Sequence, residues 1–202
     1  MLQPRAPLEH PRVLAAFSAA SDAYLRSVRE VRDWEAPGLG EWTVRELVAH
    51  ALRAYTTIET YLDAAPSSEH VIDDATTYYR VALAPADVHA TVAARGREAG
   101  AALTDPVAQV SDVSWRVLLR IAGTQPGRTV ETFAGRMVFT EYLATRVVEL
   151  ALHTTDVQHA IGTERALPAE VAALCVDVLT PVADQVDVLL GLTGREVINV
   201  LG

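Results

Sequence analysis

Residues 146–153 read RVVELALH, a mostly apolar helical stretch that carries a glutamate and a histidine four residues apart. An α-helix turns about 100° per residue, so Glu149 and His153 lie about 40° apart and point to one side. Arg146 precedes Glu149 by one turn, and Asp156 lies about 20° from Glu149 on the same stripe. Because burying such polar groups costs roughly several kcal/mol, the stripe needs partners or a ligand.

Two interpretations fit this stripe. Its groups can form a buried ion network, in which Arg146 pairs with Glu149 or Asp156 and His153 only donates a hydrogen bond. Alternatively, Glu149 and His153 can ligate a metal together with a residue from another helix. The stretch EWTVRELVAH, residues 41–50, offers His50 in the second turn of a helix. Two imidazoles and one carboxylate form an open catalytic zinc site, whose fourth position is left for water or substrate.

Apolar residues recur every three or four positions in several segments of the chain, which we predict to be helices. They span about residues 9–32, 43–65, 85–103, 139–161 and 168–192. The second helix begins at a capping box formed by Thr43 and Glu46, and the fourth ends at Gly162 as its C′ residue. A looser connection, residues 66–84, joins the second helix to the third.

Residues 113–134 differ in character from these helices. The runs Val113–Ile121 and Thr129–Phe133 flank the turn-rich stretch GTQPGR, which predicts a short β-hairpin or an irregular excursion. The fold class is therefore an all-α helical bundle. We expect a single domain over residues 1–202, with the bundle core at about 9–165 and a C-terminal helix and tail at 166–202.

Composition excludes several classes of protein. Half of the residues are hydrophobic and 21% are charged, as in ordinary globular proteins. The net charge of −9 argues against a nucleic-acid partner, which needs a basic face. No apolar run reaches the roughly 18–20 residues of a membrane helix, and no signal peptide is recognised, so we expect a cytoplasmic protein. The single cysteine, Cys175, is interpreted as a small buried hydrophobe.

Two stretches together resemble one known family. PGLGEWTVRELVAHALRAY (37–55) and GRMVFTEYLATRVVELALHTTDVQHAIG (135–162) resemble the two signatures of the mycothiol-dependent maleylpyruvate isomerase N-terminal family, which belongs to the DinB-like metal-binding bundles. LLGLTGRE, from residue 189, resembles the ending of many members. The resemblance covers most of residues 10–195 in the right order.

The resemblance implies a DinB-like up-down-down-up four-helix bundle in which His50, Glu149 and His153 bind a divalent metal, most often zinc. It also implies a thiol-dependent reaction, in which the sulfur of mycothiol, a low-molecular-weight thiol of actinobacteria, attacks a small electrophilic substrate. The isomerase itself carries a further C-terminal domain, whereas residues 166–202 suffice for one helix. We therefore expect a mycothiol-dependent transferase or isomerase that acts on a substrate other than maleylpyruvate.

Further residues are assigned around this metal site. We expect Asp156 and Arg146 to be catalytic residues beside the metal, and Arg53 and Trp42 to bind the thiol cosubstrate. Several aromatic residues are candidates to line a substrate pocket, although aromatic side chains at helical spacing are more often part of a core. They are Trp42, Tyr55, Tyr61, Tyr78, Tyr79 and Trp115.

Two other functions stay open. The same metal could activate water for hydrolysis, with Asp156 or Glu46 as the base. The chain could also be a non-enzymatic bundle that binds a metal or a small molecule, in which case a fourth protein ligand such as His89 is expected. The histidines at 10, 70, 89 and 159 are otherwise interpreted as solvated or capping residues. A homodimer is left open.

Overall fold

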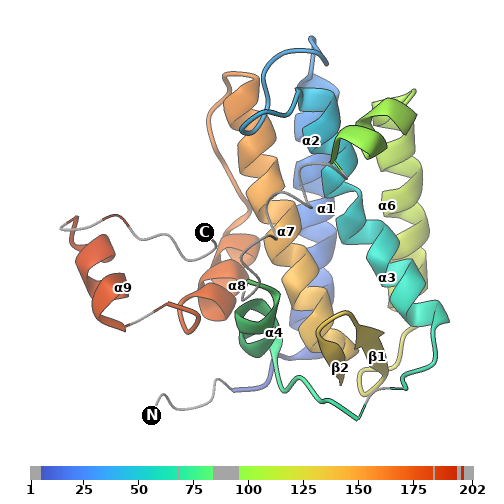
Figure 1. The fold of residues 1–202 in the computed structure, drawn as a ribbon, viewed down its shortest axis with the longest axis vertical. Coiled ribbons are helices and arrows are strands. Elements are labelled where there is room, and N and C mark those ends of the chain that lie inside the picture. The colour runs from blue at the N-terminus through green and yellow to red at the C-terminus, as the bar shows by residue number, and fades with distance from the viewer. Residues whose placement is uncertain (1–5, 68, 84–95, 184, 195–196, 198–202) are drawn as a thin grey trace.

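The computed structural model describes residues 6–67, 69–83, 96–183, 185–194 and 197, and shows a mostly helical chain with one small hairpin (Figure 1). The helices are α1 (His10–Glu30), α2 (Val44–Ala51), α3 (Arg53–Asp63), α4 (Ala75–Ala82), α6 (Pro106–Ala122), α7 (Phe139–Ala160), α8 (Ala169–Leu179) and α9 (Gln185–Leu192). Strands β1 (Thr129–Thr132) and β2 (Gly135–Val138) pair antiparallel. The predicted helical class with a short hairpin is therefore confirmed.

Helix α7 carries the RVVELALH stretch through the middle of the core. It packs against α1, α2, α3 and α8, while α1 also packs against α6 (Figure 1). Large aromatic side chains fill the space between these helices and are fully buried, for example Phe17, Tyr24, Tyr55, Phe139 and Tyr142. Because α7 is covered on several sides, polar groups on it are desolvated by their neighbours.

Two predicted helix ends are confirmed. The Thr43 hydroxyl accepts a hydrogen bond from the Glu46 amide at 3.2 Å, and the Glu46 carboxylate accepts one from the Thr43 amide at 2.9 Å. These reciprocal bonds are the capping box that starts α2. Gly162 has φ +72°, a left-handed conformation that favours glycine directly after α7.

Two predicted helices are each divided in the structure. The helix expected at 43–65 consists of α2 and α3, which meet at Leu52; this residue keeps a helical backbone with φ −57° and ψ −21°. The helix expected at 168–192 consists of α8 and α9. Pro181 follows the last residues of α8 and has no amide hydrogen to continue the helix, so this division follows from the sequence.

The prediction for Val113–Ile121 is wrong, because these residues belong to helix α6. The Asp105 carboxylate caps α6 by accepting from the Ala108 amide at 3.1 Å, and Pro106 occupies the first turn. Apolar residues at three- and four-residue spacing then face the core. The hairpin lies later in the chain, and its turn places Phe133 at the surface.

The segments predicted at 66–84 and 85–103 have different outcomes. Helix α4 lies within the expected loose connection and is capped by Asp74, which accepts from the Thr77 amide at 2.7 Å. Residues 96–102 are helical, as the third helix predicts, whereas its start at 85–95, including His89, lies outside the described residues.

Two glycines explain how residues 96–102 pack closely against α2. A Cβ atom at Gly96 would lie 2.5 Å from Cζ2 of Trp42, and one at Gly100 would lie 2.7 Å from Cγ of Glu46. Such distances are too short for any side chain to fit without a displacement. The glycines, which weaken the helix by propensity, are thus required by packing.

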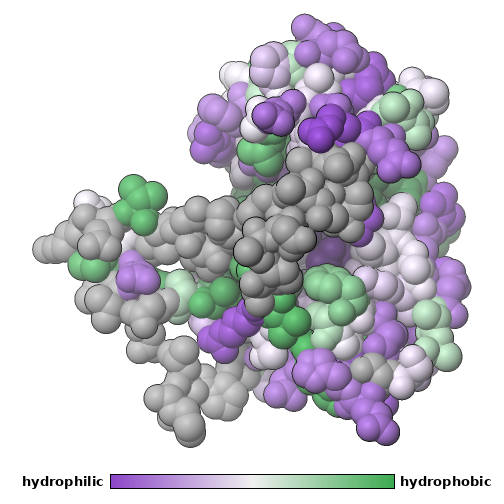
Figure 2. Space-filling model, viewed as in Figure 1, coloured by the Kyte–Doolittle hydropathy of each residue, from purple (hydrophilic) through white to green (hydrophobic). Residues whose placement is uncertain are grey.

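Ion pairs between exposed or half-exposed side chains join α3 to α6. Figure 2 shows hydrophilic side chains along the upper and right-hand edges of the viewed face, over α2 and α6. Arg116 pairs with Glu59 at 2.6 Å and Arg120 pairs with Asp63 at 2.5 Å, joining α6 to α3. None of the helices in the described residues is long and apolar enough to cross a membrane.

Candidate metal centre

The structure brings His50 of α2 next to His153 of α7. Their ring centroids are 5.1 Å apart, and the rings meet edge to face at 87°. The buried Trp42 side chain, just before α2, lies with its ring centroid 4.8 Å from that of His50. Three side chains from two distant parts of the sequence therefore meet at one place, as the predicted packing of the second and fourth helices requires.

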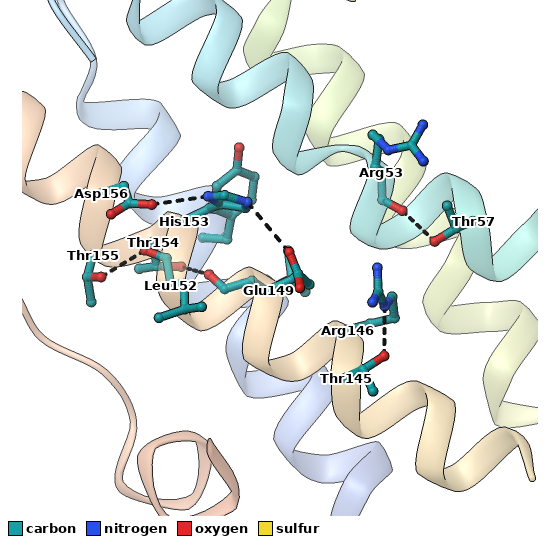
Figure 3. Close-up of polar contacts among 12 residues, drawn as sticks. Arg53, Thr57, Thr145, Arg146, Glu149, Leu152, His153, Thr154, Thr155 and Asp156 are labelled. Carbon is teal, nitrogen blue, oxygen red and sulfur yellow. Dashed lines mark hydrogen bonds and ion pairs between the residues drawn. The ribbon is translucent and has the colours of Figure 1, made fainter. Parts of the chain in front are cut away.

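His153 is held between two carboxylates of its own helix (Figure 3). Its Nδ1 lies 3.1 Å from Oδ2 of Asp156, and its Nε2 lies 3.8 Å from Oε2 of Glu149. Because an ionised carboxylate can only accept, Nδ1 carries the ring proton and donates a hydrogen bond to Asp156. Nε2 then has no proton and keeps a free lone pair. It is buried without a hydrogen-bond partner among the described residues.

Glu149 is held in place by Tyr79 of α4. The Tyr79 hydroxyl donates to Oε1 of Glu149 at 3.1 Å and lies 3.0 Å from the carbonyl oxygen of Thr145. Burial, and next the negative charge of Glu149, raise the pKa of Tyr79, so the hydroxyl stays protonated. Sequence reasoning missed this contact because it predicted no helix at α4; the Asp74 cap was the available signal.

Arg146 does not join the ion network of the alternative interpretation. It makes no ion pair with a carboxylate of the described residues; Nε donates to the Thr145 hydroxyl at 3.0 Å and Nη2 to the Tyr78 hydroxyl at 3.3 Å. Its guanidinium lies over the rings of Tyr142 and Tyr78, 5.0 Å and 5.6 Å from their centroids. Burial alone lowers the pKa of Arg146, but these tyrosines and Glu149 raise it overall, so it stays charged.

The structure does not bring the remaining predicted residues to this place in the same way. Arg53 is exposed, and Figure 3 shows its guanidinium turned away from Arg146. Trp115 is 66% exposed on α6, and Tyr55 packs against Phe17 in the core. His159 is exposed on α7, as its position on the helix predicts.

The donor types are those of a divalent-metal site, but the side chains are not gathered around one point. Among the described residues there is no group of three or more His, Cys, Asp or Glu side chains that could hold a metal ion. The predicted ligands meet instead in two pairs, His50 with His153 and His153 with Glu149. Two imidazoles and a carboxylate are the donor types of zinc, and the Asp156 contact is the typical support of a ligating histidine.

The chain is a helical protein with a cluster of histidine and carboxylate side chains between α2 and α7. The comparison with known families identifies its family. The family described as mycothiol maleylpyruvate isomerase N-terminal domain matches residues 14–158. The match covers more than half of the chain, which therefore belongs to this family, and it includes His50, Glu149, His153 and Asp156. No curated protein and no solved structure matches the chain.

Proposed function

We propose that the chain is a divalent-metal-dependent enzyme that uses mycothiol to transfer or isomerise a small electrophilic substrate. The observation that carries this proposal is His153: its ring meets the His50 ring edge to face, its buried Nε2 lies 3.8 Å from the Glu149 carboxylate, and Asp156 holds Nδ1. Family membership supports the choice of thiol. We also propose that α1, α2 with α3, α6 and α7 form the DinB-like up-down-down-up bundle.

His50, Glu149 and His153 would hold the metal, for which zinc fits best. A zinc ion lowers the pKa of a thiol that it binds, which supplies a thiolate near neutral pH. The protein's own residues prepare this site. Asp156 fixes the tautomer and orientation of His153, Tyr79 holds Oε1 of Glu149, and the Trp42 ring covers His50.

Cys175 is a poor candidate for the nucleophile of the proposed reaction. Cys175, the single cysteine, lies half-buried on α8, and burial raises the pKa of its thiol to about 12. A thiol with this pKa is almost wholly protonated at neutral pH and is a poor nucleophile. A soluble thiol cosubstrate therefore fits the chemistry better than a catalytic cysteine.

The contacts do not favour hydrolysis by the same centre. Water activation would need a carboxylate base, but Asp156 accepts from His153 and Glu46 closes the capping box of α2. The non-enzymatic alternative needs a fourth protein ligand, and its candidate, His89, lies outside the described residues.

The test combines metal analysis with thiol consumption. The purified protein is dialysed against zinc, and its metal content is measured beside the rate at which it consumes mycothiol in the presence of a haloalkane electrophile. We expect about one zinc per chain and a rate above the uncatalysed reaction. His50→Ala removes one ligand and should lose both bound zinc and activity.

His159→Ala is the matched control, because His159 lies exposed on the same helix as His153. It should keep the zinc content and rate of the unaltered protein. Equal zinc content in the His50→Ala and His159→Ala variants would overturn the assignment of the ligands. Full activity without mycothiol would instead support hydrolysis.

A further inference from the structure

Glu149 is the carboxylate among the proposed metal ligands, and its two oxygens have different neighbours. Oε1 lies 3.1 Å from the Tyr79 hydroxyl, whereas Oε2 lies 3.8 Å from Nε2 of His153 (Figure 3). Two donors bound at about 2.0–2.1 Å to one tetrahedral zinc ion lie roughly 3.3 Å apart, so Oε2 is the oxygen placed to share an ion with His153. The Glu149 side chain is 28% exposed, so an ion in solution can reach it.

The proton of the Tyr79 hydroxyl engages Oε1. An ionised carboxylate can only accept, so the proton between two oxygens 3.1 Å apart comes from the hydroxyl. The other acceptor within reach is the Thr145 carbonyl oxygen at 3.0 Å, but Thr145 lies inside α7, where the helix backbone supplies an amide donor to its carbonyl. A hydrogen bond to a charged acceptor is also about twice as strong as one between neutral groups. The proton therefore points to Glu149.

Helix α4 fixes the direction of the Tyr79 side chain. The first residue of α4, Ala75, donates its amide hydrogen to Oε2 of the buried Glu141 on α7 at 3.1 Å. The next residue, Thr76, donates its hydroxyl hydrogen to the Val178 carbonyl oxygen of α8 at 3.0 Å. Tyr79 lies one turn further along and is buried. Because α4 is anchored on both α7 and α8, the hydroxyl holds Oε1 in one position.

A carboxylate with one oxygen engaged in this way offers a metal the other oxygen. Zinc in proteins is bound by four ligands in a tetrahedron, for which one carboxylate oxygen is sufficient. Manganese and calcium prefer about six or more ligands, mostly oxygens, and a carboxylate that binds through both of its oxygens helps to supply them. A hydroxyl that holds Oε1 therefore disfavours the ions that need more ligands.

We propose that Tyr79 determines which metal the site accepts: by holding Oε1, it makes Glu149 a ligand through one oxygen and favours tetrahedral zinc over octahedral ions such as manganese. The inference rests on the proposed function, because it requires Glu149 and His153 to be metal ligands. In this role Tyr79 contacts the ligand and not the ion, so it sets specificity and takes no part in the reaction.

The test compares the affinities of the full-length protein for zinc and for manganese. The protein is treated with a chelator, and both affinities are measured by competition with a metal-binding dye. Zinc binds most sites more tightly than manganese, so the change of the affinity ratio decides, not the ratio itself. We expect Tyr79→Phe to lower zinc affinity about tenfold and to leave manganese affinity unchanged or higher. A purely structural role would weaken the binding of both ions alike.

Cobalt(II) gives a second readout, because its visible absorption is intense in a tetrahedral site and weak in an octahedral one. We expect a tetrahedral spectrum for the unaltered protein and a loss of intensity for Tyr79→Phe. Tyr142→Phe is the matched control, since it also removes a buried tyrosine hydroxyl, one that donates to the Thr57 hydroxyl at 2.6 Å. This variant should keep both the affinity ratio and the spectrum.

Three results would count against the proposal. An unchanged ratio of zinc to manganese affinity in Tyr79→Phe contradicts it, and so does an octahedral cobalt spectrum of the unaltered protein, a measurement that needs no variant to fold. If the unaltered protein binds zinc, either result refutes the role of Tyr79 and leaves the proposed function standing. An unaltered protein that binds no zinc refutes both together.

Discussion

The two ring nitrogens of His153 have different surroundings, and this difference gives the residue its chemistry. Nδ1 donates to Asp156 at 3.1 Å, whereas the buried Nε2 faces the carboxylate of Glu149 at 3.8 Å. A carboxylate behind a histidine fixes its tautomer and raises its basicity. Under the proposed function, Asp156 would therefore position His153, while the catalytic role expected from the sequence stays a prediction.

Removal of this carboxylate should weaken metal binding. We predict that Asp156→Ala lowers zinc affinity by about 10- to 100-fold, because the His153 ring loses its orientation and its charged partner. Asp156→Asn should lose less, since its amide oxygen can still accept from Nδ1. Competition with a zinc-binding dye measures both affinities. Asp177→Ala, which removes a surface partner of Arg12, is the control, and an equal affinity in both alanine variants would contradict the prediction.

Cys175 gives a second prediction at the level of a single residue. Burial raises the pKa of its thiol from 9.0 to about 12, so at pH 8 the thiolate population falls by about a thousandfold in the folded protein. We predict very slow alkylation of the native chain and rapid alkylation in denaturant, followed by mass spectrometry. Since the folded pKa lies above the unfolded one, stability should fall as the pH rises above about 9. Rapid alkylation of the native chain at pH 8 would exclude the raised pKa.

At the level of elements, the sequence predicted those helix ends that are fixed by contacts between residues close together in the chain. The capping box of Thr43 and the glycine after α7 are such contacts, and both are confirmed. The strand predicted in Val113–Ile121 failed because β-branched residues weigh toward strands, while burial of Val113, Val117 and Ile121 on one face makes a helix more stable. Tertiary packing, which a single sequence does not display, decided this element.

The same limit applies to the candidate site. His50, Glu149, His153 and Asp156 could be selected from helical spacing and family resemblance. The roles of Tyr78 and Tyr79 could not, because they depend on α4 packing against α7, which no periodicity in residues 66–84 announced. Arg146 was expected beside the carboxylates but lies among tyrosines, since its long side chain extends away from them.

The approach of residues 96–102 to α2 predicts the effect of one added methyl group. Gly96→Ala should place a Cβ atom 2.5 Å from the Trp42 ring, and we expect destabilisation by about 1–3 kcal/mol together with displacement of the ring from His50. Chemical denaturation measures the first effect, and zinc affinity the second. Gly127→Ala is the control, because nothing lies within 4 Å of the position of its Cβ atom. Equal stability of the two variants would show that the close contact does not constrain the fold.

At the scale of the whole molecule, the candidate site joins helices that are distant in the sequence. His50 belongs to α2 and His153 to α7, so the pair exists only when these helices pack together. A ligand that binds only the folded chain stabilises it in proportion to the logarithm of its concentration. Metal binding at this site would therefore raise the free energy of unfolding of the whole chain.

We predict that zinc raises the melting temperature of the chelator-treated protein. At about a hundredfold excess over the dissociation constant, the stabilisation amounts to about 2.7 kcal/mol. Scanning calorimetry with increasing zinc measures the shift, which His50→Ala should abolish and His159→Ala should retain. A shift of the same size in both variants would place the bound zinc elsewhere.

The Trp42 ring lies 4.8 Å from the His50 ring, so its fluorescence can report on changes at the candidate site. Indole fluorescence depends on the charge of a neighbouring ring, so a change of charge at His50 should alter the emission of Trp42. The other two tryptophans, Trp34 and Trp115, can be replaced by phenylalanine, which leaves Trp42 as the single tryptophan of the chain. The protein then carries an intrinsic reporter of its own candidate site, and events at His50 can be followed in real time without any added dye.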